Sequence, residues 1–176
     1  LLFAKAHGVP AALVDGAAIT AMRTAAASAV ATDHLARPEA TELAVLGYGV
    51  QAERHIEAIM KVRPIDRVRL WGRDASKAGG LAARIADRYP FDVRVEPDVR
   101  AAVCNADIIC TVTAAREPIL FADWVLPGAH VNIVGSSSTD AIEVEPGLLA
   151  RARLFVDAMP AALALGGDIN AAISQG

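Results

Sequence analysis

Two glycines lie two residues apart in the segment AVLGYGVQAERH (44–55), directly after an apolar run. Gly47, Gly49 and Ala52 match the pattern Gly-x-Gly-x-x-Gly/Ala, which connects a strand to a helix in dinucleotide-binding domains. The first glycine permits a sharp turn, the second lets the backbone approach a pyrophosphate, and the small third residue allows close helix–strand packing. Because the N–H groups at a helix start favour anions, we predict a pyrophosphate site here; an ordinary structural turn is the alternative.

The segment RLWGRD (69–74) bears on which dinucleotide would bind. NAD sites usually carry an acidic residue at the end of the second strand, whereas NADP sites accept an arginine for the 2′-phosphate. Gly72 lies near the acidic position and Arg73 follows it, and a guanidinium donates two hydrogen bonds to a phosphate. Asp74 would either cap the next helix or contact a ribose hydroxyl. We therefore predict NADP(H) in preference to NAD(H), with a solvated Arg73 as the alternative.

Small and polar side chains end two later apolar segments, DIICTVT (107–113) and HVNIVGSSS (130–138). Ligands of open α/β sheets bind outside the carboxyl ends of the strands. We therefore expect the ends of these segments to line the rest of the cofactor site; the alternative is that they are ordinary loop residues. The residues concerned are Thr111, Val112, Thr113, Asn132, Val134 and Gly135.

These residues need a scaffold, and residues 41–157 have the pattern of alternating strands and helices. Short apolar runs predict strands at 41–46, 67–72, 92–97, 107–113, 130–138 and 153–157. Helical spacing and helix-start signals predict helices at 50–62, 74–90, 98–106 and 146–152. This alternation favours a parallel sheet covered on both faces, so we predict an α/β fold with a doubly wound, Rossmann-type sheet.

The first 40 residues have a different pattern. Two short strands joined at His7-Gly8 predict a hairpin, and the alanine-rich residues 17–36 predict a helix that stops before Pro38. We interpret this part as the tail of a separate domain plus a connecting helix. Because the chain begins at Leu1 and not at a methionine, we expect it to be a piece of a longer protein.

Composition narrows the class of protein. Of 176 residues, 54% are hydrophobic and 21% are charged, which supports a packed core and argues against disorder. The net charge of −3 and the lack of a basic stripe argue against nucleic acid as a partner. No apolar run is long enough for a membrane span and no signal-peptide pattern is present, so we expect a cytoplasmic protein without membrane association.

The cysteines and histidines suggest no metal site. Cys104 and Cys110 fit no zinc spacing, and we expect both to be buried thiols. The four histidines form no recognisable triad or metal set, and each is expected at the surface or with satisfied hydrogen bonds. His55 follows the glycine turn on a predicted helix, and we expect it to face solvent.

The motifs together resemble the ornithine cyclodeaminase/mu-crystallin family. The resemblance rests on RTAAASAVA (23–31), LAVLGYGVQA (43–52), EPILFADWVLPGAHVNIVGSSS (117–138) and LLARARLFVD (148–157). It implies a Rossmann domain and a second, substrate-binding domain that uses both chain ends and forms a homodimer. The units expected on this basis are 1–39, a remnant of the substrate and dimerisation domain with the connecting helix; 40–165, the Rossmann domain; and 166–176, the start of the return to the substrate domain.

The resemblance also implies roles for single residues. Arg23 would hold the carboxylate of a small amino- or imino-acid substrate, and Thr24 would help to hold the cofactor phosphates. The pyrophosphate would be lined by Gly49, Val50 and Gln51, and the nicotinamide side by Thr113, Asn132, Val134 and Gly135.

One departure from the family pattern bears on the reaction. Cyclodeaminases of the family carry an essential aspartate in VGxD, but this sequence has VGSSS, which puts Ser137 at that place. A serine cannot act as a carboxylate base near neutral pH. The resemblance therefore implies an NAD(P)(H)-dependent imino- or amino-acid oxidoreductase similar to ketimine reductases. The alternatives are an ornithine cyclodeaminase-like lyase that makes proline with bound NAD, with Asp140 as a substitute for the aspartate, and a non-catalytic protein that binds NADP(H) or a small ligand.

Overall fold

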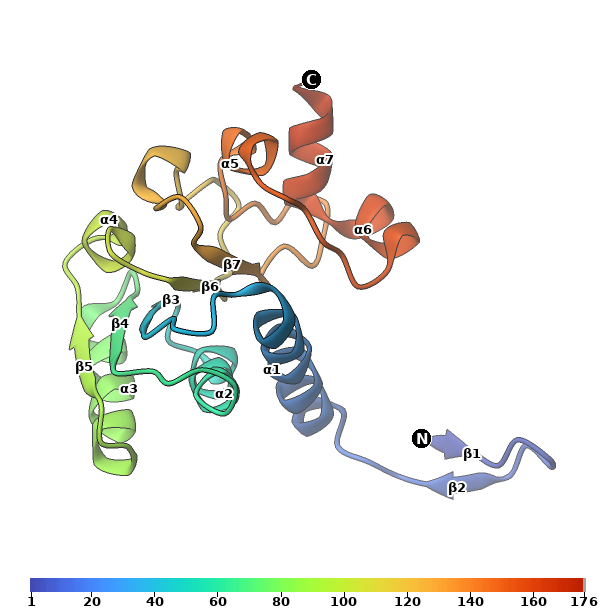
Figure 1. The fold of residues 1–176 in the computed structure, drawn as a ribbon. Coiled ribbons are helices and arrows are strands. Elements are labelled where there is room, and N and C mark those ends of the chain that lie inside the picture. Colours follow the sequence, from blue (N-terminus) through green and yellow to red (C-terminus); the bar gives the residue numbers. More distant parts are fainter. Residues whose placement is uncertain (176) are drawn as a thin grey trace.

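A sheet of five parallel strands lies at the centre of the computed structural model, which describes residues 1–175 (Figure 1). The strands are β3 (Glu42–Leu46), β4 (Arg67–Trp71), β5 (Asp92–Val95), β6 (Ile108–Thr111) and β7 (His130–Ile133). Their order across the sheet is β5-β4-β3-β6-β7, so β4 and β5 are added on one side of β3 and β6 and β7 on the other, and the order of strands reverses at the boundary between β3 and β6. The predicted doubly wound α/β sheet is confirmed, and its carboxyl edge at this boundary is where such folds bind ligands.

Helices cover both faces of the sheet because neighbouring side chains of a strand point to opposite faces. Leu43 and Val45 of β3 belong to one buried cluster, and Ala44 and Leu46 belong to another. The first cluster includes residues of α1 (Gly16–Leu35), α2 (Val50–Ile59) and α3 (Ala75–Arg88). The second includes residues of α4 (Val99–Val103), η1 (Ala122–Trp124) and α5 (Pro146–Arg151). The sheet therefore has a hydrophobic core on each of its two faces.

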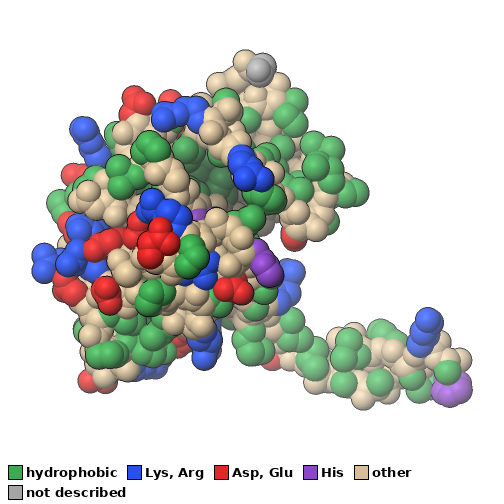
Figure 2. All heavy atoms as spheres, viewed as in Figure 1, with side chains coloured by type: hydrophobic (Ala, Val, Ile, Leu, Met, Phe, Trp, Pro, Cys, Tyr) green, Lys and Arg blue, Asp and Glu red, His purple; other side chains and the backbone are tan. Residues whose placement is uncertain are grey.

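A hairpin at the amino end extends away from the rest of the chain (Figure 1). It consists of β1 (Leu2–Phe3) and β2 (Pro10–Ala12), which pair antiparallel, and the turn contains Gly8 with a φ of 65°. Apolar side chains of residues 1–14 are exposed, among them Leu2 and Leu13. Figure 2 shows hydrophobic side chains along this projecting segment. The predicted hairpin is confirmed, and so is the helix that follows, which packs along α2. The assignment of this part to a separate domain stays a prediction.

The sixth strand predicted at 153–157 is wrong. α5 ends at Arg151, and no described residue pairs with the segment that follows. Leu154 and Phe155 are exposed, and the guanidinium of Arg153 lies 5.6 Å from the centroid of the Phe155 ring. The apolar pattern is present, but the sheet ends at β7. An apolar run without a neighbouring strand has no backbone partners and cannot form a strand.

Two further helices complete the carboxyl end, α6 (Met159–Leu165) and α7 (Gly167–Ser174), and α7 packs against α5. No helix in the described part of the chain has the length and apolar character needed to cross a membrane. Cys110 is buried in β6 as predicted, but the prediction for Cys104 is wrong because this residue is exposed. It is the C-cap of the short helix α4, which puts its side chain outside the core.

Candidate binding site at the carboxyl edge of the sheet

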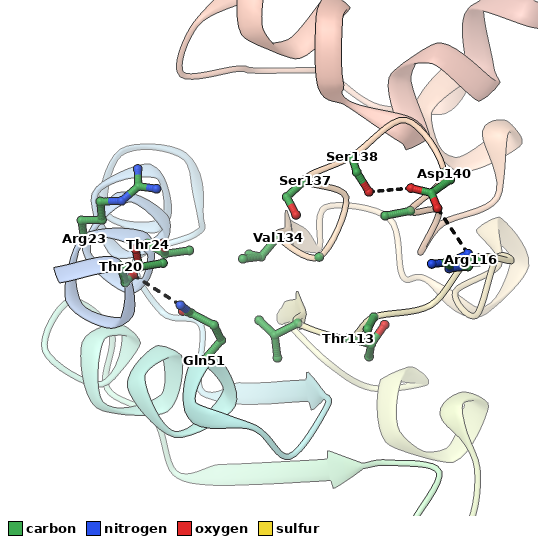
Figure 3. A pocket seen from close by; sticks show the side chains of 14 residues that line it. Thr20, Arg23, Thr24, Gln51, Thr113, Arg116, Val134, Ser137, Ser138 and Asp140 are labelled. Carbon is green, nitrogen blue, oxygen red and sulfur yellow. Dashed lines mark hydrogen bonds and ion pairs between the residues drawn. The ribbon is translucent and has the colours of Figure 1, made fainter. Parts of the chain in front are cut away.

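A cleft of about 430 Å³ opens at the carboxyl edge of the sheet. Its walls are α1, the first turn of α2 and the loops that follow β6 and β7 (Figure 3). Segments far apart in the sequence therefore meet around one space. The predicted site residues that line it are Arg23, Thr24, Gln51, Val112, Thr113, Val134, Gly135 and Ser137.

The glycine turn connects β3 to α2, and the structure requires a glycine at one of its two glycine positions but not at the other. Gly47 has a φ of 131°, and a Cβ there would lie 2.7 Å from the carbonyl oxygen of Val112, so the fold itself requires glycine. Gly49 has a φ of −83°, and a Cβ there would meet no atom within 4 Å. Neither strain nor packing requires a glycine at position 49, and the absence of a side chain leaves the backbone there open to the close approach of a ligand.

The first turn of α2 offers backbone donors next to Gly49. The helix begins at Val50 and no side chain caps it. Because the first N–H groups of a helix have no intrahelical acceptor, those of Val50 and Gln51 are available for an anion. The Gln51 side chain donates through Nε2 to the carbonyl of Thr20 on α1 at 3.3 Å, and its Oε1 is buried without a partner among residues 1–175. This turn has the polar groups that a phosphate cradle needs.

Two charged residues follow β4: Arg73 is an exposed cation, and Asp74 caps the next helix. Arg73 is exposed, and none of the described residues forms an ion pair or hydrogen bond with its guanidinium. Asp74 is the N-cap of α3 and accepts a hydrogen bond from the N–H of Lys77 at 3.1 Å. That bond is the main cause that lowers the pKa of Asp74 below its ordinary value. Of the two roles considered for Asp74, the helix cap is the one that the structure contains.

A second hollow, of about 560 Å³, lies beyond the ends of β4 and β5. Two tryptophans, Trp71 and Trp124, and Ile119 form apolar walls, and Asp98 and Arg100 are also part of the lining. This hollow was not predicted, because its walls come from three segments far apart in the sequence: the end of β4, the start of α4 and the segment around η1. An apolar recess with aromatic walls suits a flat ring system.

Glu143 is buried behind the loops that follow β6 and β7, and it was not predicted. Its carboxylate accepts hydrogen bonds from Oγ1 of Thr111 at 2.7 Å, from both N–H and Oγ1 of Thr113 at 2.6 Å, and from the N–H of Gly135 at 2.6 Å. Burial raises the pKa of Glu143, against the lowering effect of these bonds. One side chain thus fixes Thr113 and Gly135 relative to each other in the cleft wall.

The side chain of Asp168 on α7 fixes the backbone at Glu143. Its carboxylate accepts the N–H groups of Glu143 and Val144, both at 2.9 Å, and its own N–H donates to Oγ of Ser136 at 2.9 Å. The segment predicted to return to another domain therefore also supports the loop after β7. No sequence pattern marks these two acids, because each depends on contacts between distant segments.

Two predicted residues lie behind the cleft wall and not among its lining residues. Thr111 is fully buried and its hydroxyl binds Glu143. Asn132 is also buried and donates through Nδ2 to Oγ1 of Thr32 on α1 at 3.0 Å. Both side chains stabilise the surroundings of the cleft, and direct contact of either with a cofactor stays a prediction.

Ser137 is exposed on the loop after β7 and faces the cleft, with Arg23 of α1 on the opposite side (Figure 3). Asp140, the alternative carboxylate, accepts a hydrogen bond from Oγ of Ser138 at 2.7 Å and lies 3.4 Å from the guanidinium of Arg116. The Ser138 bond and then the nearby Arg116 lower the pKa of Asp140. A carboxylate held in its ionised form in this way is a weak base.

The prediction that His55 faces solvent is wrong. The side chain is fully buried between α1 and α2, with Nε2 3.0 Å from Oγ of Ser28 and Nδ1 2.7 Å from the carbonyl oxygen of Gln51. Because a carbonyl only accepts, Nδ1 carries the proton and Nε2 accepts from Ser28. Burial lowers the pKa of His55, so the ring is neutral near pH 7. The packing of α1 on α2, which covers this face, was not anticipated.

Comparisons with known proteins agree with this arrangement. The model of the ornithine cyclodeaminase/mu-crystallin family matches residues 1–175. Ketimine reductase mu-crystallin of Rattus norvegicus is 45% identical over 169 residues, which cover 96% of this chain and 53% of that protein. The solved structure of Thermococcus litoralis Delta(1)-pyrroline-2-carboxylate reductase in complex with NADH and L-proline is similar with a TM-score of 0.96 and 33% identity, over 99% of this chain and 54% of the other.

A cyclodeaminase is among the similar structures as well. A lysine cyclodeaminase is similar with a TM-score of 0.84 and 34% identity, over 93% of this chain and 48% of the other. The chain spans about half the length of the relatives that it matches. Since the family model matches almost every residue, and the fold and glycine turn agree with it, the chain belongs to the ornithine cyclodeaminase/mu-crystallin family.

Proposed function

We propose that the protein reduces a small cyclic imino acid with a nicotinamide dinucleotide. The observation that carries this proposal is a cleft lined both by Arg23 of α1 and by Gln51 in the first turn of α2, two residues after Gly49, where a Cβ would meet nothing within 4 Å. An exposed guanidinium and a helix start without a side-chain cap thus meet at one cleft. The similarity to a reductase that holds NADH and L-proline supports the same conclusion.

The two hollows suit the two halves of the dinucleotide. The pyrophosphate would lie on the N–H groups at the start of α2, the nicotinamide in the cleft beside Thr113 and Gly135, and the adenine between Trp71 and Trp124. Thr24, which also lines the cleft, would approach the phosphates from α1. This placement accounts for the cofactor role of Gly47, Gly49, Val50 and Gln51 that the sequence predicted.

The substrate would lie over the nicotinamide with its carboxylate on Arg23. When bound, a reduced nicotinamide supplies a hydride to the carbon of a protonated imine, which becomes a secondary amine and keeps the proton on nitrogen. Arg23 would fix the distance and direction of that carbon, and the Glu143-bound wall would hold Thr113 and Gly135 at the other side. Ser137 would present a hydroxyl to the substrate, where a cyclodeaminase needs a carboxylate base.

NADP(H) is the cofactor that we propose in preference to NAD(H). The guanidinium of Arg73 is exposed and unpaired among the described residues, and the position before it is Gly72, which offers no carboxylate to a ribose. The similar Thermococcus litoralis enzyme holds NADH, so this preference rests on the residues of this chain and is not inherited from that relative.

We also propose that the exposed apolar surface of the hairpin is covered in the whole protein. Leu2, Phe3 and Leu13 are exposed, and a hairpin of two strands is marginally stable by itself. Residues 1–39 would belong to a substrate and dimerisation domain, residues 40–165 to the dinucleotide domain, and residues 166–176 would lead back to the first. The whole protein would then be a homodimer.

Turnover and titration test the proposal. The whole protein should oxidise NADPH when pyrroline-2-carboxylate is added, and residues 1–176 should bind NADPH without turnover because most of the substrate domain lies outside them. Conversion of ornithine to proline without net change in NADPH would instead favour the cyclodeaminase. Tight NADPH binding without turnover of any imino or amino acid by the whole protein would favour a binding protein.

A further inference from the structure

Tyr48, the residue between the two glycines of the turn, lies against Gly72 after the neighbouring strand. The two turns are adjacent because β3 and β4 pair from Glu42 to Leu46, and the N–H of Gly47 donates to the carbonyl of Trp71 at 2.8 Å. The tyrosine ring is half-buried and packs on the core cluster of that face. Its position is therefore set by the packing of the domain.

The ring occupies the space that a side chain at position 72 would need. A Cβ built on Gly72 would lie 2.1 Å from Cδ1 and 2.7 Å from Cε1 of Tyr48, closer than real Cβ contacts. The backbone gives no other reason for glycine, because the positive φ values among the described residues belong to Gly8, Gly47 and Gly128. Tyr48 is thus the group that requires glycine at position 72.

Position 72 directly follows the second strand of the sheet, near the place where dinucleotide sites discriminate between NAD and NADP. An acidic side chain at the end of the second strand binds the ribose hydroxyls of NAD and repels the 2′-phosphate of NADP. The nearest carboxylate here, Asp74, caps α3 and lies 3.6 Å from the ammonium of Lys77, so its charge is directed to the helix start. The exposed guanidinium of Arg73, directly after position 72, has no partner among the described residues.

We propose that Tyr48 preserves the preference for NADP(H) over NAD(H) by leaving no room for a side chain at position 72. The tyrosine excludes the carboxylate that would favour NAD(H), although it does not itself read the 2′-phosphate. This inference rests on the proposed binding of NADP(H) and adds to it the residue that excludes an NAD-selecting side chain at position 72.

Five proteins test this inference: the wild type, Tyr48→Ala, Gly72→Asp, the double variant Tyr48→Ala/Gly72→Asp, and the control Tyr48→Phe/Gly72→Asp. Each is titrated with NADPH and with NADH by the quenching of tryptophan fluorescence, and each is melted to give Tm. Tyr48→Ala keeps Gly72 and should therefore keep the wild-type preference for NADPH. Gly72→Asp should have a lower Tm and should gain no affinity for NADH. The double variant with alanine should regain Tm, bind NADH about tenfold more tightly than the wild type and lose affinity for NADPH, whereas the control with phenylalanine should behave like Gly72→Asp alone.

Two outcomes would overturn the inference and are distinguishable from each other. If Gly72→Asp alone moves the affinity from NADPH to NADH without loss of Tm, the ring moves aside and Tyr48 does not set selectivity, while the dinucleotide function stands. If the wild type binds neither dinucleotide, the proposed function fails and the inference fails with it. Should Gly72→Asp not fold, the comparison of the two double variants, which differ in the ring, still decides the matter.

Discussion

The hydroxyl oxygen of Ser28 lies 3.0 Å from Nε2 of His55, although the two residues are 27 positions apart and belong to different helices. Nδ1 of the same ring lies 2.7 Å from the carbonyl oxygen of Gln51, in the first turn of α2. The histidine therefore links the helix that carries Arg23 to the turn that offers backbone donors to a phosphate. The relative position of these two parts of the site depends on a neutral, buried ring.

This arrangement predicts a loss of stability in mild acid. Burial lowers the pKa of His55 below its unfolded value of about 6.5. The unfolded state then binds more protons, so the free energy of unfolding should fall as pH decreases from about 6.5 toward 5. Urea unfolding at several pH values measures the slope, and His55→Gln should reduce it.

A matched control for this slope is His7→Gln, since His7 is exposed on the hairpin. Burial also lowers the pKa of His130, so part of the slope should remain in His55→Gln. The lowered pKa values of Asp74, Asp107 and Asp140 act only in stronger acid, below their ordinary value of 3.8. The raised pKa of Glu143 gives a slope of opposite sign above its ordinary value of 4.5, in the wild type and in His55→Gln alike. An unchanged slope in His55→Gln would show that His55 does not titrate as a buried group.

The two glycines of the turn should respond in opposite ways to alanine. Gly47→Ala should destabilise the fold by about 1–3 kcal/mol because of its φ of 131° and the contact with Val112. Gly49→Ala should change stability by less than about 1 kcal/mol, since a Cβ there meets nothing, but should weaken dinucleotide binding about tenfold. Melting curves and NADPH titrations of both variants check this, and unchanged binding in Gly49→Ala would remove the main support for a pyrophosphate at this turn.

Glu143→Gln should destabilise the cleft wall. The carboxylate accepts four hydrogen bonds, two of them from the N–H groups of Thr113 and Gly135, and an amide must turn an NH₂ group toward one of these donors. We expect a loss of about 1–3 kcal/mol in unfolding free energy, with weaker NADPH binding. Glu117→Gln, at an exposed carboxylate, is the control, and equal stability of the two variants would contradict the role of Glu143.

The sequence predicted the structural features that depend on neighbouring residues, but not the buried contacts that join distant segments of the chain. The strand before Gly47 and the helix after Gly49 were identified because the apolar run, the turn and the helical spacing are contiguous. The burial of His55 was missed because it is created by α1, a helix that was assigned to another part of the protein. Glu143 was missed for the same reason, since its partners come from two other loops. Residues 153–157 have a strand pattern, but only the finished sheet decides that no edge is available to them.

Arg73→Ala should weaken the binding of NADPH but not the binding of NADH. If the guanidinium binds the 2′-phosphate, its removal should weaken NADPH binding about tenfold or more and leave NADH binding unchanged. Arg94→Ala removes the same charge from an exposed arginine of β5 and should alter neither affinity. Equal weakening of NADPH and NADH, or no weakening, would contradict the assignment.

Ser137 is where the reductase and the cyclodeaminase predictions diverge. The residue faces the cleft opposite Arg23, so a carboxylate at this position would lie near a substrate held by that guanidinium (Figure 3). In the whole protein, Ser137→Asp should lower the rate of imine reduction and introduce conversion of ornithine to proline without net change in NADPH, since it supplies the missing base. Ser137→Asn has the same size without the charge and should lower imine reduction without any proline formation. Proline formation by the wild type, or an equal response to the two substitutions, would mean that the side chain at position 137 does not decide the chemistry.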